Sequence, residues 1–363
     1  MATKILFLVP YPTNEAPSQR FRFEQYLELL NQRKFQYKIL SFLSLEGWSN
    51  FYEGNVFKKT LLLSTGFFKR FAHVFKAKDF DFIFIHRELF PIGFPIFEWI
   101  IVNISKAKIV YDFDDAIWKE DPNEKGSLKG YIKYKSKIAF IIKNSFVISA
   151  GNQYLADYAN QYCDYVKINP TTVDTMKLHN PALNRHKDPI SSESIPSIGW
   201  TGTHSTIHYL TSIVPVLKRL SSEYSFKFIV ISNQCPNFDL NNMEFIKWSK
   251  DTEVEDLMKI DIGIMPLTSD PWSKGKCGFK ALQYLSLQKP ALVSPIGVNA
   301  KIVQHGLTGF HCNTEEDWYK YISILFNHKD LGIKMGRKGR AFVKEFYSVE
   351  SNKENFLSLF EVP

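Results

Sequence analysis

Three aspartates follow one predicted strand, and their spacing could support acid–base chemistry or the orientation of an acceptor. Asp112, Asp114 and Asp115 come directly after the apolar run 108–111, and the first two share a face if the strand continues. Because like charges at one strand end repel each other, we predict that at least one carboxyl group has a raised pKa. The alternative is a helix N-cap in a solvated acidic loop. A calcium loop is not indicated, since its Asn, Gly and Glu pattern is missing, and we predict no metal site.

Lysines and glycines open a predicted helix in the second half of the chain. Lys274, Lys276 and Lys280 are interspersed with two glycines there. Backbone N–H groups, the helix dipole and ammonium charges would converge on an anion at such a place. The spacing differs from that of a P-loop, and no Lys-Ser or Lys-Thr pair ends it.

A second junction of this kind is the segment 199–205, which reads Gly-Trp-Thr-Gly-Thr-His-Ser. Small and hydroxyl residues such as Gly202 and Thr203 let a ligand approach the backbone closely. For this junction and for the lysine-rich one, the alternative is an ordinary loop with an N-cap. Their occurrence in the same half of the chain favours a binding site.

Arginines follow two strands of the first half. Arg20 and Arg22 lie two residues apart after the first strand, and Arg87 follows the strand that ends near His86. The guanidinium fork suits phosphate or carboxylate groups, and we expect these arginines to face one rim. Surface salt bridges are the alternative.

The elements that must position these groups alternate between short apolar runs and helical patterns. The first half predicts strands at 5–9, 37–42, 82–85, 108–111 and 146–149 and a helix over 21–30. The second half predicts strands at 198–200, 226–231, 245–246, 262–266 and 291–293 and helices over 210–220 and 279–287. This alternation indicates an α/β protein with two doubly wound parallel sheets, whose ligands bind at the carboxyl ends of the strands.

A polar segment rich in proline and serine separates the two halves. We place the first domain at residues 1–170, a linker at 171–196 and the second domain at 197–345. This division fits the usual size of domains.

Composition narrows the class of protein. The 363 residues carry a formal charge of +8 and include 31 Phe. No apolar run reaches the roughly 18 residues of a membrane span. The four cysteines are scattered without a C-x-x-C pair, which fits a reducing cytoplasm. Basic charge combined with aromatic residues leaves nucleic acid, an anionic membrane or a phosphorylated ligand open at this point.

One stretch of the second half resembles the glycosyltransferase family 4 (group 1) pattern. Residues 294–310 contain a Ser-x-x-Gly turn, a helix and a closing Gly-x-Thr-Gly before an apolar residue. The segments 261–267 and 168–174 are similar to that family's strand before the donor loop and to its interdomain segment. Tyr347 and Ser348 resemble the start of the family's final helix.

The resemblance implies a GT-B fold, in which two Rossmann-like domains face a cleft and a C-terminal helix, here 346–363, returns to the first domain. It implies a retaining, metal-independent transferase that needs no cofactor and uses a nucleotide-diphosphate sugar. The implied donor contacts are Gly202, Thr203, Lys276, Lys280, Gln283, Gly297, Val298 and Asn299. The implied catalytic residues are Asp112, Asp114 and Lys280, and the acceptor contacts are Arg20, Arg22, Arg87 and Asp115.

The chain departs from the family pattern at its acidic positions. The paired glutamates of the family fall on Gly275 and Gln283, and a further glutamate falls on Lys301. Because lysines appear where acids vanish, we favour a divergent subfamily over an inactive relative. A nucleotide-sugar epimerase and a non-catalytic nucleotide-sugar-binding protein are the alternatives.

Two segments of the first half interleave lysines with apolar residues, at 69–76 and 125–135. Such segments suit an interfacial helix on anionic lipid, and the alternative is a solvated helix with core-facing aromatics. Membrane contact would make a lipid-linked saccharide a plausible acceptor in cell-surface glycan synthesis, at the inner face of the cytoplasmic membrane. Nucleic acid becomes the least favoured partner, because no nucleic-acid-binding motif accompanies the charge.

Overall fold

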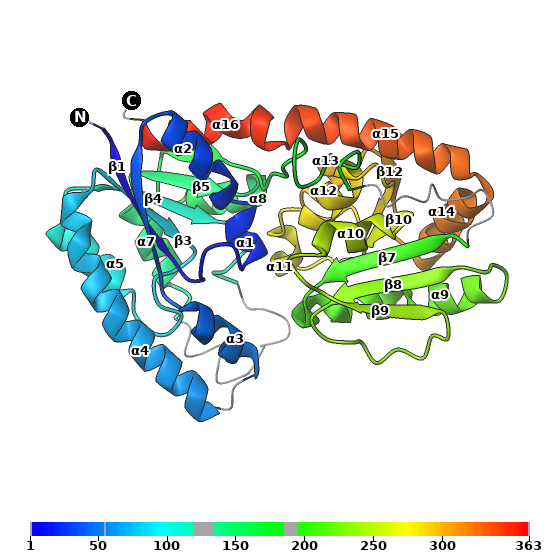
Figure 1. Ribbon diagram of the computed structural model, residues 1–363, viewed down its shortest axis with the longest axis horizontal. Helices are drawn as coiled ribbons and strands as arrows, with labels where there is room; N and C mark the ends of the chain where they lie inside the picture. Colours follow the sequence, from blue (N-terminus) through cyan, green and yellow to red (C-terminus); the bar gives the residue numbers. More distant parts are fainter. Residues whose placement is uncertain (1, 54–55, 120–133, 185–194, 362–363) are drawn as a thin grey trace. The chain divides into compact units, whose positions relative to one another are not determined.

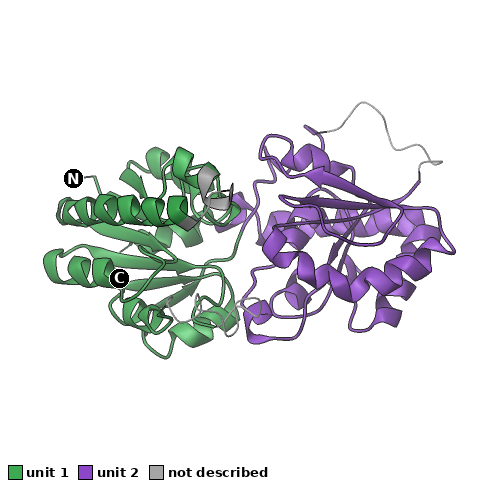
Figure 2. Ribbon diagram, turned by 90° about the horizontal axis from the view of Figure 1, so that it is seen from below, with its two compact units in different colours: residues 1–171, 353–363 green, residues 172–352 purple. Residues whose placement is uncertain are grey.

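The computed structural model describes residues 2–53, 56–119, 134–184 and 195–361 (Figure 1). The chain divides into two compact units, of which unit 1 comprises residues 1–171 and 353–363 and unit 2 comprises residues 172–352 (Figure 2). Each unit is built on one six-stranded sheet whose strands pair in parallel. The predicted α/β class with two doubly wound sheets is confirmed.

The sheet of unit 1 has the order β2-β1-β3-β4-β5-β6. Its strands are β1 (Lys4–Val9), β2 (Gln36–Ser41), β3 (Phe82–His86), β4 (Lys108–Phe113), β5 (Val147–Ala150) and β6 (Val166–Ile168). β1 and β3 are neighbours although β2 lies between them in sequence, so the direction of winding reverses there. Ligands of doubly wound sheets bind beyond the carboxyl ends of the strands at such a switch point.

The helices of unit 1 cover both faces of this sheet (Figure 1). They are α1 (Pro17–Arg20), α2 (Leu27–Gln32), α3 (Leu45–Glu53), α4 (Val56–Phe75), α5 (Ile96–Ile104), α7 (Lys137–Lys143) and α8 (Gln153–Ala159), with short 3₁₀ turns η1 (Glu24–Tyr26) and η2 (Lys76–Asp79). None of the helices in the described ranges is long and apolar enough to cross a membrane.

The single helix predicted over 21–30 is wrong, because the structure divides this segment into η1 and α2. Phe21, Arg22 and Phe23 are consecutive and each is at most 2% exposed. The backbone of these three residues forms turns rather than a continuous helix. The backbone accordingly leaves the helical region at Phe23, where φ is −136°.

The end of the chain completes the core of unit 1. The last helix is α16 (Val349–Leu357), which is followed by η5 (Ser358–Phe360). The Phe356 ring stacks on Tyr26 with a centroid distance of 4.4 Å, and Phe360 packs near Phe7 and Phe84. The expected return of the C-terminal helix to the first domain is thereby confirmed.

The sheet of unit 2 has the order β12-β11-β10-β7-β8-β9. Its strands are β7 (Ser197–Gly202), β8 (Lys227–Ser232), β9 (Met243–Lys247), β10 (Ile262–Met265), β11 (Ala291–Val293) and β12 (Gly309–His311). Counted within the unit, this is the Rossmann order 3-2-1-4-5-6, and its switch point lies between β7 and β10.

The helices of unit 2 pack against both faces of its sheet. They are the 3₁₀ helix η4 (His204–Ile213) followed by α9 (Val214–Ser221), α10 (Glu253–Met258), α11 (Pro271–Lys274), α12 (Phe279–Ser286), α13 (Asn299–Ile302), α14 (Glu315–Asn327) and α15 (Lys329–Phe346). Neighbouring residues of β8 divide between two core layers, with Phe228 in one and Ile229 in the other. The helix predicted over 210–220 is interrupted at Pro215, which lacks the N–H that would continue it from η4.

Candidate functional site

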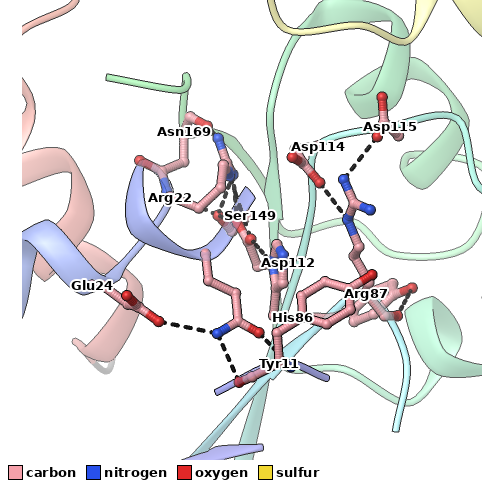
Figure 3. Close-up of polar contacts among 12 residues, drawn as sticks. Tyr11, Arg22, Glu24, His86, Arg87, Asp112, Asp114, Asp115, Ser149 and Asn169 are labelled. Atoms are coloured by element: carbon pink, nitrogen blue, oxygen red, sulfur yellow. Dashed lines mark hydrogen bonds and ion pairs between the residues drawn. The ribbon is translucent and has the colours of Figure 1, made fainter. Parts of the chain in front are cut away.

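A buried polar cluster lies on the three central strands of unit 1 (Figure 3). The parallel register places His86 opposite Asp112 and Asp112 opposite Ser149, so the three side chains share one face of the sheet. His86 Nδ1 lies 2.7 Å from Asp112 Oδ2, and the Ser149 hydroxyl donates to Asp112 Oδ1 at 2.6 Å. Arg22 completes the cluster with an ion pair to Asp112 and a hydrogen bond to the carbonyl oxygen of Asn169.

This cluster is sealed from solvent. The side chains of Arg22, His86 and Asp112 are 0% exposed. Burial alone would raise the pKa of Asp112, but the charges and hydrogen bonds of Arg22 and His86 outweigh it and hold that pKa well below its usual value. Asp112 is therefore an ionised carboxylate inside the domain.

These facts revise two assignments made from the sequence. Asp112 was predicted to be catalytic and Arg22 to bind an acceptor, yet both are enclosed and bonded to each other. The role that their geometry supports is to fix the ends of β3, β4 and β5. Arg20 lies apart from this pair at the end of α1, where its guanidinium packs over the Phe21 ring at 5.0 Å.

Arg87 begins a second, accessible layer directly after β3. Its Nε donates to Asp114 and its Nη2 to Asp115, both at 2.7 Å. The side chains of Arg87, Asp114 and Asp115 are 21%, 12% and 22% exposed, so a ligand can reach them. The structure thus brings together three of the predicted residues.

The backbone of Arg87 is held in an unusual conformation. Its φ is +61°, in the left-handed region that residues other than glycine rarely adopt. Its N–H donates to the Asp112 carbonyl at 2.8 Å, and its own carbonyl accepts from the Tyr111 hydroxyl at 2.6 Å. Strain of this kind persists where the surroundings over-determine it, and it is common at functional sites. Here it directs the guanidinium toward the two aspartates.

The pKa of Asp114 also runs against the prediction. Burial raises it, but the charge and hydrogen bond of Arg87 together with the charges of His86 and Arg22 outweigh burial, and the net shift of the pKa is downward. The predicted raised pKa is therefore wrong for Asp112 and Asp114, because each carboxylate has a guanidinium partner that repulsion arguments did not include. An ionised Asp114 is a weak proton acceptor and a good hydrogen-bond acceptor for a hydroxyl group.

Tyr11 stands beside Arg87 at the switch point of unit 1. The Gln19 side chain fixes the loop after β1 by accepting from the Tyr11 N–H at 2.8 Å and donating to the Tyr11 carbonyl at 3.0 Å. Glu24 in turn accepts from Gln19 at 3.0 Å and from the Asn14 N–H at 2.8 Å. Burial raises the pKa of the Tyr11 hydroxyl, so it stays protonated and can donate a hydrogen bond.

In unit 2, β7 and β10 separate at the expected switch point. They pair only at Ile198–Ile262 and Gly199–Gly263. Beyond these pairs the Tyr284 hydroxyl links the two strands, since it accepts from the Thr201 N–H at 3.1 Å and donates to the Ile264 carbonyl at 3.4 Å. Gly263 must be glycine because a Cβ there would lie 2.2 Å from the Tyr284 ring.

Two predicted lysines lie near the carboxyl end of β7. The Lys280 ammonium is 5.5 Å from the centre of the Trp200 ring, and the Lys276 ammonium is 5.7 Å from that of Tyr209. Tyr209 also contacts Ser273 through their hydroxyl groups at 3.0 Å. Positive charge is therefore concentrated where a Rossmann sheet receives a phosphorylated ligand.

Glycines bring the lysine-rich loop into contact with the loop after β11. Gly297 has a φ of +57°, and a Cβ on it would lie 2.7 Å from the Lys274 carbonyl oxygen. Gly278, with a φ of +69°, precedes α12, and a Cβ on it would lie 2.2 Å from Ile302. Gly202, at the end of β7, has no room for a Cβ because the Trp200 ring would be 2.6 Å away. These close approaches hold three predicted donor segments in place.

The remaining predicted donor residues differ in accessibility. Thr203 contacts the Ser205 hydroxyl at 2.8 Å at the exposed start of η4, and Val298 is partly exposed. Gln283 is 2% exposed, and its amide donates to Glu253 at 2.8 Å. Asn299 is 1% exposed, and its own N–H already donates to the Ile296 carbonyl at 3.3 Å. A backbone contact of Asn299 with phosphate would need that bond to break.

Sequence patterns missed several residues of these sites. Tyr209 could have been suspected, because it closely follows the strand-to-helix junction that was singled out. Glu253 carried no signal, since its contact with Gln283 depends on how α10 and α12 pack. Within the described residues no group of three or more His, Cys, Asp or Glu side chains could hold a metal ion.

Part of unit 2 is similar to a known protein family. Residues 229–342 match the family described as "Glycosyl transferases group 1". No curated protein sequence matches the chain significantly.

Several solved structures share its fold over nearly the whole length. Sucrose-phosphate synthase from Thermosynechococcus elongatus has a TM-score of 0.68 at 11% identity, and 99% of this chain and 98% of that chain are covered. Anabaena HepE in complex with UDP and glucose has a TM-score of 0.63 at 13% identity, with 98% of each chain covered. An α,α-trehalose-phosphate synthase (UDP-forming) from Burkholderia vietnamiensis has a TM-score of 0.64 at 10% identity, with 99% and 98% covered.

The match lies in unit 2, where the lysines and the glycine turns meet at the switch point, and the likeness in fold extends over both units. The predicted GT-B fold is thereby confirmed, and the predicted family is matched over residues 229–342. This stretch of the chain is similar to the group 1 glycosyltransferases, and both units together have the GT-B fold of the structural neighbours.

Proposed function

We propose that this glycosyltransferase moves a sugar from a nucleotide-diphosphate sugar to a hydroxyl group of a saccharide acceptor, with retention at the anomeric carbon and without a metal ion. The observation that carries the proposal is the position of Lys276 and Lys280 beside the switch point of the Rossmann sheet in unit 2. A departing diphosphate needs positive charge, and ammonium groups held near aromatic rings in a partly buried site supply it.

In this reaction the bond between the anomeric carbon and the diphosphate oxygen breaks, and the negative charge grows on the diphosphate. Lys276 and Lys280 would stabilise that charge, while Gly202 and Gly297 permit the close packing against Trp200 and Lys274 that holds the donor segments in place. Because HepE was crystallised with UDP and with UDP-glucose, UDP-sugars are the first donors to test.

The acceptor would be held by the accessible layer of unit 1. Arg87 fixes Asp114 and Asp115 as ionised hydrogen-bond acceptors, which suits the orientation of a sugar hydroxyl. We propose a saccharide or lipid-linked saccharide acceptor in cell-surface glycan synthesis. A cytoplasmic site of action, at the inner face of the cytoplasmic membrane, agrees with four scattered cysteines that form no disulfide within the described residues.

Isothermal titration of UDP and GDP against the wild type and Lys280→Ala tests the donor site. We expect the better nucleotide to bind the variant about ten- to a hundredfold more weakly, since a charge-assisted contact contributes about 1.5–3 kcal/mol. Lys338→Ala, an exposed lysine of α15, is the matched control and should bind as the wild type does.

Equal affinity of wild type and Lys280→Ala would overturn the diphosphate assignment. If the nucleotide binds but neither transfer nor donor hydrolysis occurs with any saccharide acceptor, the chain is a binding protein and the catalytic proposal fails. Conversion of the donor sugar in the absence of an acceptor would instead identify an epimerase.

A further inference from the structure

Helix α4 presents an apolar stripe to solvent. Phe57, Leu61, Phe68, Phe71 and Phe75 recur at helical spacing on one face of the helix, and their exposed fractions range from 44% to 78%. In a soluble helix this face would carry polar residues, because large apolar side chains normally turn toward the core. The alternative for segment 69–76 was a solvated helix whose aromatic side chains face the core. That alternative is wrong for Phe71 and Phe75, because both rings face solvent.

The opposite face of α4 fixes this orientation. Arg70 is fully buried and donates to the Leu40 and Val9 carbonyls at 3.0 and 2.7 Å, at the carboxyl ends of β2 and β1. Gly66 allows close packing, because a Cβ there would lie 2.4 Å from the Phe42 ring. Val74 is also fully buried. Rotation of the helix to hide its stripe would break these contacts, so the stripe is a lasting feature of the surface.

Further large apolar side chains are exposed on neighbouring segments. α5 packs beside α4 (Figure 1), and it exposes Ile96 and Trp99, while Phe94 is exposed just before it. Trp, like Tyr, is enriched at the boundary between a bilayer and water. We call the α4 stripe together with Phe94, Ile96 and Trp99 the aromatic face of unit 1.

The charged side chains along α4 are all positive. From Val56 to Lys78 the sequence has no Asp or Glu, and Lys69, Lys76 and Lys78 are exposed. The first carboxylate after this stretch is Asp79. A groove on a partner protein would match the apolar residues alone, whereas an anionic bilayer matches both the apolar residues and the lysines that flank them.

We propose that the aromatic face of unit 1 binds the surface of an anionic lipid bilayer, with α4 lying in the plane of the interface. The phenylalanines and Trp99 enter the boundary between headgroups and acyl chains, and Lys69, Lys76 and Lys78 contact anionic headgroups. This inference goes beyond the proposed sugar transfer and does not depend on it. The other segment that interleaves lysines with apolar residues, 125–135, lies outside the described residues except at Tyr134 and Lys135.

Vesicle sedimentation of the full chain, without donor or acceptor, tests the proposal. We expect the wild type to bind vesicles of phosphatidylcholine with phosphatidylglycerol more tightly than phosphatidylcholine alone. Phe68→Ser combined with Phe71→Ser should lower the partition coefficient by about tenfold, which corresponds to about 1.4 kcal/mol. Lys69→Glu combined with Lys76→Glu should lower binding to the anionic vesicles by about tenfold and leave binding to neutral vesicles unchanged.

Matched controls come from exposed residues of α15 in unit 2. Ile333→Ser combined with Phe346→Ser removes apolar surface that is 54% and 50% exposed, and Lys338→Glu reverses one exposed charge. Both should bind vesicles as the wild type does. The bilayer assignment would be overturned if the wild type failed to bind anionic vesicles, or if the control variants lost as much binding as the test variants. Failure of the wild type to bind would leave a groove on a partner protein as the surface that covers the aromatic face. Circular dichroism of every variant confirms that a loss of binding is not a loss of folding.

Discussion

At the scale of single residues, the two layers of unit 1 show how similar side chains acquire different tasks. Asp112 and Asp114 are two residues apart and each pairs with an arginine, yet Asp112 is fully enclosed and Asp114 is accessible. The difference arises because β4 ends at Phe113 and the chain then leaves the sheet. Residue type and spacing locate an acidic cluster, but only burial separates the carboxylate that holds the domain together from those that a substrate can reach.

The buried carboxylate leads to a prediction about stability. Asp112→Asn leaves the Arg22 guanidinium buried without a counter-charge, so the unfolding free energy of unit 1 should fall by about 3–5 kcal/mol at neutral pH. The folded-state pKa of Asp112 lies below the unfolded value of about 3.9. The stability that the Asp112 carboxylate contributes is therefore fully present above about pH 3.9, and it is lost as the pH falls through the folded-state pKa. Below about pH 3.9 the unfolding free energy of the variant should therefore depend less on pH than that of the wild type. Urea denaturation over a pH series measures both effects.

The matched control is Asp239→Asn, which removes an exposed partner of Lys218. Its stability should stay close to that of the wild type, since exposed ion pairs contribute little. Nucleotide affinity in unit 2 should be the same in both variants. If Asp112→Asn unfolds at the same urea concentration as the wild type, the ion pair does not hold unit 1 together.

At the scale of elements, the sequence predicted the strands better than the helices. Apolar runs such as 82–85 and 291–293 match β3 and β11 closely, because a strand of a parallel sheet is buried on both faces and must be apolar throughout. The helix patterns over 21–30 and 210–220 failed, because the backbone leaves the helical region at Phe23 and because Pro215 lacks the N–H group that would continue the helix from η4.

Strand order and register lay beyond sequence reasoning. The buried cluster exists because β3, β4 and β5 are neighbours with His86, Asp112 and Ser149 in line, and no local pattern encodes which strands pair. The lysine-rich loop was found because its signal is local, in the types and spacing of adjacent residues. The Gln283–Glu253 contact was missed because it joins two helices that are distant in sequence.

A prediction at this scale concerns the two loops that meet at Gly297. Gly297→Ala and Gly306→Ala each place a Cβ on a residue with positive φ, which destabilises each variant by about 1–2 kcal/mol. Only the Cβ at Gly297 also meets a backbone atom, the Lys274 oxygen at 2.7 Å, so the lysine-rich loop must move. Isothermal titration with UDP should show roughly tenfold weaker binding for Gly297→Ala.

Gly306→Ala is the control, since nothing lies within 4 Å of its added Cβ. Its nucleotide affinity should equal that of the wild type despite a similar loss of thermal stability. A parallel loss of affinity in both variants would mean that backbone strain, rather than displacement of the loop, explains the effect.

At the scale of the whole molecule, the excess of phenylalanine has two separate causes. One group of rings forms the core of unit 1, where Phe7, Phe84 and the C-terminal Phe356 and Phe360 pack together. Another group lies exposed on α4. Composition alone does not distinguish the two groups of phenylalanines. The lysines also form two groups, one near the switch point of unit 2 and the other beside the aromatic face of unit 1.

Because Phe356 and Phe360 follow unit 2 along the chain and pack into unit 1, the core of unit 1 is complete only when these residues have joined it. Phe356→Ala removes a ring that is 0% exposed and stacked on Tyr26, so unit 1 should lose about 3–5 kcal/mol of stability. Hydrogen exchange measured by mass spectrometry should show the loss of protection in peptides of 1–171 and not in those of 172–352. Phe346→Ala, whose ring is 50% exposed, should leave both units as protected as in the wild type. Loss of protection in unit 2 as well would show that the two units unfold as one, and the C-terminal residues would then stabilise the entire chain rather than the unit into which they pack.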